Sequence, residues 1–376
     1  MNSITQGLLS AGCEVKVLSV ATDKHPVREQ QLTPEYRQAT HFESVYVDLA
    51  VHPVDAFVTL MCGESYHVKR YISQELQERI ISILDSEEFD VVHLESVFLT
   101  PYVPTIRRHS NAAVVLRAHN VENLIWRQLA NGTHNPLKRS YLKHLALTLA
   151  VYEREHVNEY DGVVCITERD AAYFRDNGCR KPIVAIPFAV TPEPMSGIDE
   201  EPFSLFHLGS MDWMPNIEGV EWLLEKVWPK IHAEVPQVRL YLAGRNMPKH
   251  IVETEAEGVS VVGEVPDAMY FIGSKQINIV PLLSGSGIRV KIIEAMSAGK
   301  VVISTTVGAE GINYTDGENI LIADTPEQFA QQVRRCVEDP DLCRTIGDNA
   351  YRFIADNYDK EVLTKQLLAF YDRIIC

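Results

Sequence analysis

The chain has 376 residues, of which 46% are hydrophobic and 23% charged, so it is long enough for two globular domains and too apolar for a disordered protein. Its formal net charge of −16 argues against a broad nucleic-acid-binding surface. The seven cysteines are scattered and form no CxxC pair, which predicts reduced thiols in a cytoplasm. The sequence has no long apolar run and does not begin like a leader peptide, so we expect a protein that is neither secreted nor membrane-spanning.

Short apolar runs alternate with amphipathic stretches along the whole chain. Because these runs are almost continuously apolar, they are typical of parallel strands that are covered on both faces. The predicted strands are EVKVLSV (14–20), FDVVHLE (89–95), AAVVLRAH (112–119), DGVVCIT (161–167), KPIVAIP (181–187), FSLFHLG (203–209), VRLYLAG (238–244), VSVVGEV (259–265), INIVPL (277–282) and KVVIST (300–305). The predicted helices include residues 68–86, 137–156 and 218–231. This alternation, repeated twice, predicts an α/β fold of two doubly wound domains.

The domain boundary is expected in residues 187–202, which hold four prolines and show no helical or strand period. We therefore predict an N-terminal domain over 1–187, a C-terminal domain over 203–356 and a final helix over 357–376 that packs back toward the first domain. The chain opens in a helix-like run, so the N-terminal domain is expected to lack the first strand of a doubly wound domain. A fragment, a late translation start or an unusual domain would each explain this.

Residues 277–299 contain the sequence pattern that points most directly to a binding site. Strand 277–282 leads into the turn SGSG (284–287), and a helix is expected from about residue 289 to 298, ending at Gly299. A helix N-terminus preceded by glycines and joined by Arg289 and Lys291 suits a phosphate or diphosphate. Glu294, one turn later, could accept hydrogen bonds from hydroxyls. The alternative is a simple turn with a surface pair of Lys291 and Glu294.

The segment GSGIRVKIIEAMSAGKVVIST (285–305), with HLGSMDWMPNIEGVEWLLEKVWP (207–229) and LRAHNVENLIWRQLA (116–130), resembles the retaining glycosyltransferases of family 4, also called glycosyltransferase group 1. The resemblance covers nearly the whole chain. It implies the GT-B fold, in which two Rossmann-like domains face each other. It also implies that the donor nucleotide sugar binds the C-terminal domain and the acceptor mainly the N-terminal one.

The resemblance also implies roles for individual residues. Arg289 and Lys291 would hold the donor diphosphate, and Glu294 the ribose. Ser286 stands where many members of the family have a glutamate, which puts the contact of that glutamate in doubt. His119, at the end of strand 112–119, would bind the donor sugar or the transition state. The remaining donor-binding predictions are Gly209, Ser210, Asp212, Gly263, Val265 and Gly287.

Some of these positions also have plainer interpretations. Asp212 could be a helix cap, and Gly263 and Val265 could mark an ordinary strand end. Trp213, Trp222 and Trp228 are expected in the core or between domains. The motif DPD (339–341) suits a helix start better than a metal site. The basic and aromatic run 137–152 is expected to be a buried helix, with a peripheral membrane contact as the alternative.

The predicted function is the transfer of a hexosyl group from a UDP- or GDP-sugar to a glycan or lipid-linked acceptor, with retention. The resemblance also suggests bacterial surface polysaccharide synthesis as the setting. No metal, no other cofactor and no nucleic acid are expected, and the protein is placed in the cytoplasm or at the inner face of the membrane. The alternatives are a catalytically impaired or truncated nucleotide-binding GT-B protein, a nucleotide-sugar epimerase and a phosphorylase.

Overall fold

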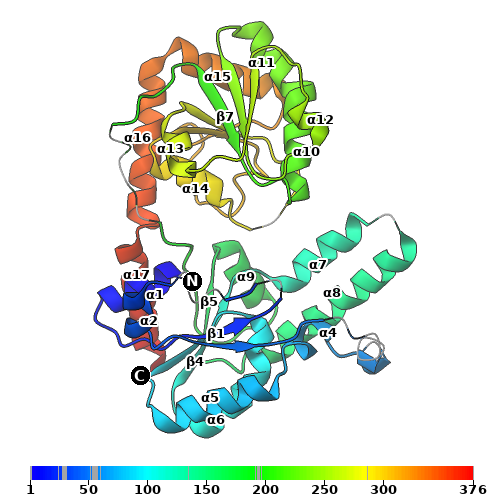
Figure 1. Ribbon diagram of the computed structural model, residues 1–376, viewed down its shortest axis with the longest axis vertical. Coiled ribbons are helices and arrows are strands. Elements are labelled where there is room, and N and C mark those ends of the chain that lie inside the picture. The colour runs from blue at the N-terminus through cyan, green and yellow to red at the C-terminus, as the bar shows by residue number, and fades with distance from the viewer. Residues whose placement is uncertain are drawn as a thin grey trace. The chain divides into compact units, whose positions relative to one another are not determined.

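A computed structural model of the chain (Figure 1) describes residues 2–23, 25–27, 32–50, 52, 58–59, 61–133, 135–190, 192, 195, 197–285 and 287–375. The chain divides into two compact units. Unit 1 comprises residues 1–188 together with residues 363–376, and unit 2 comprises residues 189–362. Unit 1 is therefore built from two separate stretches of the chain.

All described strands of unit 1 pair in parallel, in a two-stranded sheet β1-β2 and a four-stranded sheet β3-β4-β5-β6. The strands are β1 (Leu18–Ala21), β2 (Glu43–Tyr46), β3 (Val91–Leu94), β4 (Ala113–Ala118), β5 (Gly162–Cys165) and β6 (Ile183–Ala185). The helices are α1 (Asn2–Ser10), α2 (Pro34–Ala39), α4 (Tyr66–Lys69), α5 (Gln74–Ser86), η2 (Val97–Tyr102), α6 (Val103–His109), α7 (Glu122–Asn131), α8 (Pro136–His156) and α9 (Glu168–Asp176). Helices α7 and α8 form a hairpin that projects from the rest of unit 1 (Figure 1).

The last helix, α17 (Lys360–Ile375), completes unit 1. Its Phe370 lies so close to Gly162 of β5 that a β-carbon at Gly162 would stand 2.7 Å from the ring. The Tyr371 hydroxyl also forms a hydrogen bond with the His93 ring of β3. The C-terminal helix is thus part of the core and of the polar network of the N-terminal unit.

Unit 2 contains one parallel sheet in the order β12-β11-β10-β7-β8-β9. Its strands are β7 (Ser204–Leu208), β8 (Arg239–Ala243), β9 (Val259–Gly263), β10 (Ile277–Val280), β11 (Val301–Ser304) and β12 (Leu321–Ile322). Its helices are α10 (Met214–Trp222), η3 (Leu223–Val227), α11 (Trp228–Glu234), α12 (Lys249–Val252), α13 (Ala268–Gly273), α14 (Val290–Ser297), α15 (Pro326–Glu338) and α16 (Pro340–Asn357). The strand order reverses between β7 and β10, and such a switch point is where open α/β sheets bind ligands.

Neighbouring residues of these strands enter separate hydrophobic clusters. Leu205 packs with Ile279 in a cluster that includes α11 and α15, whereas Phe206 packs with Val280 in a cluster that includes α14 and α16. Successive side chains of a strand point to opposite faces, so both faces of the sheet are buried. This burial is the physical reason for the continuous apolar runs in the sequence.

Two strands and two helices differ from the sequence expectation, and one of these helices, predicted over 68–86, is divided into α4 and α5. The sequence analysis missed β2 and β12, because β2 is half polar and β12 has two residues. The single helix expected over 218–231 is interrupted by the π-helical segment η3, which is followed by Pro229 in the first turn of α11. Proline lacks the N–H that an α-helix needs and its ring clashes with the preceding turn, so the wider π turn accommodates it.

Candidate active site

The ammonium group of Lys291 lies at the switch point of unit 2. Its Nζ donates to Oδ1 of Asn216 at 2.8 Å and contacts Nε2 of His207 at 3.3 Å. Both partners are neutral groups, and an ammonium has three N–H donors. Burial, assisted by the nearby charge of Arg289 and opposed by that of Glu294, lowers the pKa of Lys291 to about 7. A buried cation whose direct hydrogen-bond partners are all neutral would be stabilised by an anionic ligand.

The two neutral partners are held so that their acceptor atoms face Lys291. The Nδ1 atom of His207 lies 2.9 Å from the carbonyl of Ile279, so Nδ1 carries the proton and Nε2 is left as an acceptor. Burial, assisted by the charge of Lys291, holds the pKa of His207 well below its ordinary value, so the ring is neutral. The Asn216 amide donates to the carbonyl of Ser210 at 2.7 Å, which turns its Oδ1 toward the lysine.

Gly209 provides the space that Lys291 occupies. A β-carbon at Gly209 would stand 2.6 Å from Nζ of Lys291 and 2.9 Å from Nδ2 of Asn216. Both contacts are too close for real atoms, so any side chain here would displace the ammonium group. The glycine that follows β7 is therefore a steric requirement of the lysine position.

The guanidinium of Arg289 is buried, with only 4% of the residue exposed. Its Nη1 donates to the carbonyl of Gly287 at 2.6 Å, and its carbon lies 4.9 Å from the ring centre of Trp213. A β-carbon at Gly285 would meet the same Trp213 ring at 2.8 Å. Trp213 is 36% exposed, so it does not belong to the core of unit 2, and its alternative place between the domains stays a prediction. The aromatic face and the guanidinium attract each other, and burial lowers the pKa of Arg289 to about 10.

Helix α14 begins beside these cations without a side-chain cap. Arg289 is its N-cap residue, and the side chain of Arg289 makes no capping hydrogen bond. A helix start presents unpaired N–H groups and a partial positive charge. Glu294 lies one turn further along and is partly buried, which raises the pKa of its carboxyl group, while Lys291 opposes that rise. The observed start, Val290, is one residue later than predicted, and Gly299 follows the helix with a φ of 69°.

The other donor-site predictions occupy different places around this group. Ser210 donates to Oδ2 of Asp212 at 2.8 Å, and the Asn246 amide donates to both Asp212 oxygens at 2.9 Å. Asp212 therefore braces two loops and is not a helix cap, because the N-cap of α10 is Trp213.

Gly263 and Val265 lie at the end of β9, two strands away from β7. Gly263 has a φ of 76°, and its carbonyl accepts a hydrogen bond from the N–H of Gly244. Val265 packs against the core. Ser286 lies outside the described residues. Two of the three expected core tryptophans are in place, since Trp228 is buried and Trp222 packs against Phe329. Asp339 caps α16 by accepting the N–H of Leu342, as expected for a helix start.

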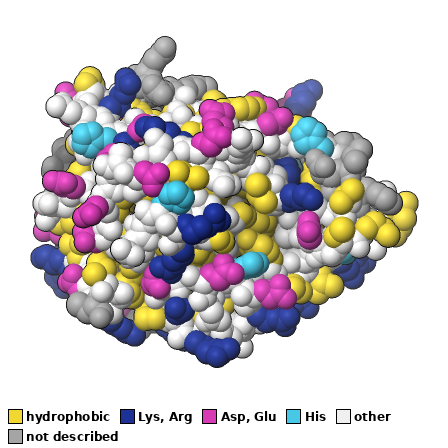
Figure 2. Space-filling view, turned by 90° about the horizontal axis from the view of Figure 1, so that it is seen from below, with side chains coloured by type: hydrophobic (Ala, Val, Ile, Leu, Met, Phe, Trp, Pro, Cys, Tyr) yellow, Lys and Arg dark blue, Asp and Glu magenta, His cyan; other side chains and the backbone are white. Residues whose placement is uncertain are grey.

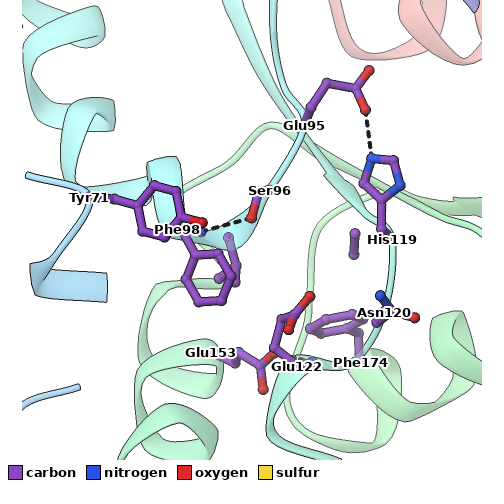
Figure 3. A pocket seen from close by; sticks show the side chains of 11 residues that line it. Tyr71, Glu95, Ser96, Phe98, His119, Asn120, Glu122, Glu153 and Phe174 are labelled. Carbon is purple, nitrogen blue, oxygen red and sulfur yellow. Dashed lines mark hydrogen bonds and ion pairs between the residues drawn. The ribbon is translucent and has the colours of Figure 1, made fainter. Parts of the chain in front are cut away.

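In unit 1, His119 follows β4 and lines a pocket of about 290 Å³ (Figure 3). Its Nε2 lies 2.7 Å from Oε2 of Glu95, which follows the neighbouring strand β3. Burial favours the neutral form of Glu95, but the hydrogen bond from His119 and the charge of Arg117 outweigh it and lower the pKa of Glu95 to about 2. The ionised carboxylate accepts a hydrogen bond from Nε2 of His119 and so orients the ring.

The opposite wall of this pocket carries two further carboxyl groups (Figure 3). Glu153 of α8 accepts the backbone N–H of Glu122 at 2.9 Å and a hydrogen bond from the amide of Asn123, both in α7. Burial, followed by the charge of Glu153, raises the pKa of Glu122 to about 7. Tyr71, Phe98 and Phe174 complete an aromatic lining. Aromatic faces combined with hydroxyl-binding carboxyl groups suit a polyhydroxylated ligand.

The structure brings together Lys291, Arg289, Gly209 and the start of α14 in unit 2, while His119 stands in unit 1. Sequence reasoning missed Glu95, Asn216, His207 and the Trp213–Arg289 stack. Glu95 could have been found, because it ends the strand predicted beside that of His119. No group of His, Cys, Asp and Glu suited to hold a metal ion occurs among the described residues, and none of their helices is long and apolar enough to cross a bilayer.

Comparisons with known proteins agree with this architecture. Residues 202–339 match the family described as "Glycosyl transferases group 1", and residues 1–189 match the "Glycosyl transferase 4-like domain". The chain is 25% identical over 299 residues to an "Uncharacterized 44.6 kDa protein in cps region" of Klebsiella pneumoniae, which covers 76% of this chain and 75% of that protein.

Solved structures resemble the chain over nearly its full length. Sucrose-phosphate synthase from Thermosynechococcus elongatus has a TM-score of 0.68 at 17% identity and covers 99% of this chain and 91% of its own. Anabaena Alr3699/HepE in complex with UDP has a TM-score of 0.62 at 13% identity and covers 96% of this chain and 100% of its own. The chain therefore belongs to the glycosyl transferases of group 1, with a glycosyl transferase 4-like domain at its N-terminus and the GT-B fold of two Rossmann-like domains.

Proposed function

We propose that this glycosyltransferase moves a hexosyl group from a nucleoside diphosphate sugar to a glycan or lipid-linked acceptor, with retention of the anomeric configuration. The observation that carries the proposal is the desolvated ammonium of Lys291, which meets only neutral partners beside the uncapped start of α14. A diphosphate would supply the missing counter-charge and cap the helix in one step. The UDP bound in the structure of HepE supports the same choice of ligand.

The chemistry follows from where charge develops. Breaking the glycosyl–phosphate bond places negative charge on the departing diphosphate. Fixed donors that face this charge act mainly in the transition state, which is where stabilisation accelerates a reaction. In the proposal, Lys291, Arg289 and the N–H groups of α14 serve in this way without a divalent metal or another cofactor. Retention would follow if the acceptor attacks from the face that the phosphate leaves.

The remaining predicted residues have supporting roles in this proposal. Glu294 would accept hydrogen bonds from the ribose, and Gly287 with Ser286 would line the phosphate path. Gly209, Ser210 and Asp212 would shape the donor loop, and Gly263 with Val265 would bracket the base. Nδ1 of His119 would accept a hydrogen bond from a sugar hydroxyl. The relative in a Klebsiella cps region supports a role in surface polysaccharide synthesis, which we place in the cytoplasm.

Calorimetric titration of the full chain with UDP, GDP, ADP and dTDP tests the nucleotide site. We expect one of them to bind with a stoichiometry of one, and the matching monophosphate to bind at least about tenfold more weakly, because one charged contact contributes on the order of 1.5–3 kcal/mol. Equal affinity for the monophosphate and the diphosphate would contradict the proposal. Incubation of the cognate sugar donor without acceptor should give slow hydrolysis and no isomerised donor. In a separate transfer reaction, the anomeric coupling constant of the glycosylated product shows whether the configuration is retained.

The pKa of Lys291 predicts that diphosphate binding takes up a proton. Above about pH 7 the free lysine is largely neutral, whereas a bound anion favours its charged form. At pH 8.5, where the phosphate groups are already ionised, uptake should approach one proton, and affinity should fall by up to about tenfold per pH unit. Titrations in buffers of different ionisation enthalpy measure this uptake. The Lys291→Met variant should show none, and a wild-type protein without uptake would show that Lys291 does not meet the phosphate.

A further inference from the structure

Two neighbouring strands of unit 1 carry charged and polar residues that share one face of the sheet. Strand β3 contains His93 and leads to Glu95, and strand β4 contains Arg117 and leads to His119. Residues two apart on a strand point to the same face. Because His93 is in parallel register with Val115, which precedes Arg117 by two positions, all four side chains lie on that face. They form one polar group on the sheet.

Helix α17 covers the same face. Gly162 of β5 is in register with Val115, and Phe370 packs directly against it. The next residue of α17, Tyr371, is only 8% exposed. Its hydroxyl forms a hydrogen bond with Nδ1 of His93, and the two rings meet edge to face with their centres 6.0 Å apart. The C-terminal helix is thus tied to the polar group through His93.

The ring of His93 stands between Tyr371 and the carboxylate of Glu95. Burial, opposed by the charge of Glu95, lowers the pKa of His93 to about 4, so the ring is neutral and only one of its nitrogens carries a proton. Its Nε2 lies 4.0 Å from Oε1 of Glu95. A proton on Nδ1 would turn the lone pair of Nε2 toward the carboxylate, whereas a proton on Nε2 is attracted to it. We therefore assign Tyr371 as the donor to Nδ1, with the N–H of Nε2 facing Glu95.

The other oxygen of the Glu95 carboxylate has different partners. Oε2 lies 2.7 Å from Nε2 of His119 (Figure 3) and 4.0 Å from Nε of Arg117. Arg117 is 1% exposed, and its guanidinium donates to the carbonyls of Ile186 and Pro187 at 3.2 and 3.3 Å. Charged side chains on the molecular surface, where both signs are interspersed (Figure 2), can reorient in water. The Glu95 carboxylate instead faces nitrogen atoms that are themselves held in place, so its position depends on them.

We propose that Tyr371 and His93 are positioning residues, through which α17 fixes the carboxylate of Glu95 and, with it, the ring of His119. Neither Tyr371 nor His93 lines the pocket, so neither would touch a substrate bound there. The effect of this positioning on transfer rests on the proposed function, which assigns His119 to the donor sugar or the transition state. The competing interpretation is that the hydrogen bond between Tyr371 and His93 only satisfies two buried polar groups. In that case, loss of the hydroxyl would lower stability without changing the turnover of the folded protein.

Removal of the Tyr371 hydroxyl tests the inference on the full chain. Tyr371→Phe keeps the ring, and we expect kcat to fall about tenfold, since misplacement of a catalytic group by about 1 Å costs up to about 100-fold. Affinity for the nucleoside diphosphate, which binds unit 2 in the proposed function, should stay that of the wild type. In the His119→Asn background the same substitution should change kcat by less than about twofold, because its effect passes through His119. Wild-type kcat in Tyr371→Phe, or an equal loss in both backgrounds, would overturn the inference.

Tyr160→Phe is the matched control. Tyr160 is fully buried in the core of the same unit, its hydroxyl forms a hydrogen bond with Thr100, and it does not line the pocket. Its substitution should lower the urea midpoint of unfolding at least as much as Tyr371→Phe does, and it should leave kcat unchanged. A matching loss of kcat in both variants would show that loosened packing explains the effect. His93→Leu removes both contacts of the ring and should lower kcat by a similar factor, and its wild-type turnover would contradict the inference where Tyr371→Phe does not fold.

NMR of ¹⁵N-labelled histidine rings tests the positioning without substrate. The ¹⁵N chemical shifts of the His119 ring report its hydrogen bond to Glu95, and we expect them to move in Tyr371→Phe. Those of His109, whose partner Asp85 lies on the surface, should stay. Unchanged His119 shifts would overturn the inference even if transfer is impaired. Full turnover in His119→Asn alone would instead refute the role of His119 in the proposed function, but not the coupling between α17 and its ring.

Discussion

Lys291→Met should lower turnover by about two to three orders of magnitude, as expected when one charged transition-state donor is removed. Methionine keeps an unbranched side chain, one atom shorter, but cannot replace the ammonium that Asn216 and His207 orient. The variant should nevertheless be at least as stable as the wild type at pH 7. The folded-state pKa of about 7 lies below the unfolded value, so the unfolded chain binds more protons between about pH 7 and 10. Stability therefore rises with pH across that window, and methionine removes the cost of the buried charge.

Lys275→Met provides the matched control for this experiment. Lys275 also lies in unit 2, but its Nζ is paired with Glu201 at 2.6 Å and stands 4.1 Å from the ring centre of Tyr241. Its loss should lower the urea midpoint of unfolding and leave donor affinity unchanged. The opposite behaviour of the two lysines separates a ligand-binding cation from a structural one. Wild-type turnover in Lys291→Met would contradict the assignment.

Glu95→Gln should reduce both activity and stability. The carboxylate orients the His119 ring and lies 4.0 Å from Nε of the buried Arg117, so glutamine removes the charged acceptor of His119 and the counter-charge of Arg117. We expect roughly 100-fold lower turnover and a loss of about 3 kcal/mol in the free energy of unfolding at pH 7. Because the pKa of Glu95 is lowered to about 2 in the folded protein, this contribution is present above about pH 4 and disappears as the pH falls toward 2.

Two comparisons separate positioning from folding. His119→Asn should match the activity loss of Glu95→Gln while keeping most of the stability, because His119 is partly exposed. Asp85→Asn removes a carboxylate that stands at the same 2.7 Å from an imidazole, that of His109, but on the surface. Its effect should stay below about 1 kcal/mol. Full activity in both Glu95→Gln and His119→Asn would exclude the pocket from the reaction.

The elements of the sheets were largely predictable, and the reason is burial on both faces. Leu205 and Phe206 belong to different clusters of the core, and a strand of this kind must be apolar at every position. Strand β12 was not predicted, because its two residues, Leu321 and Ile322, are too few to show a periodic pattern. The π-helical turn of η3 was not predicted either, because residue helix propensities do not indicate how a helix adjusts its backbone to Pro229.

The site was only partly predictable, because its contacts connect distant parts of the chain. Lys291 and Arg289 stood out as cations at the start of an apolar helix. Nothing in the strand FSLFHLG indicates that the ring of His207 faces a lysine 84 residues away. Trp213 was expected in the core or between the domains, and nothing in the sequence indicated that its ring lies against the guanidinium of Arg289. The roles of these residues toward a ligand stay predictions until a nucleotide is bound.

The two-part construction of unit 1 determines how the protein can be dissected. Residues 189–362 form one uninterrupted stretch that contains the whole six-stranded sheet, so this half suits recombinant expression by itself. A fragment that stops at Val362 would remove Phe370 from β5 and Tyr371 from His93. Expression of the unit that holds His119 would therefore require fusion of the C-terminal helix, for instance through a short glycine-rich linker from Phe188 to Leu363.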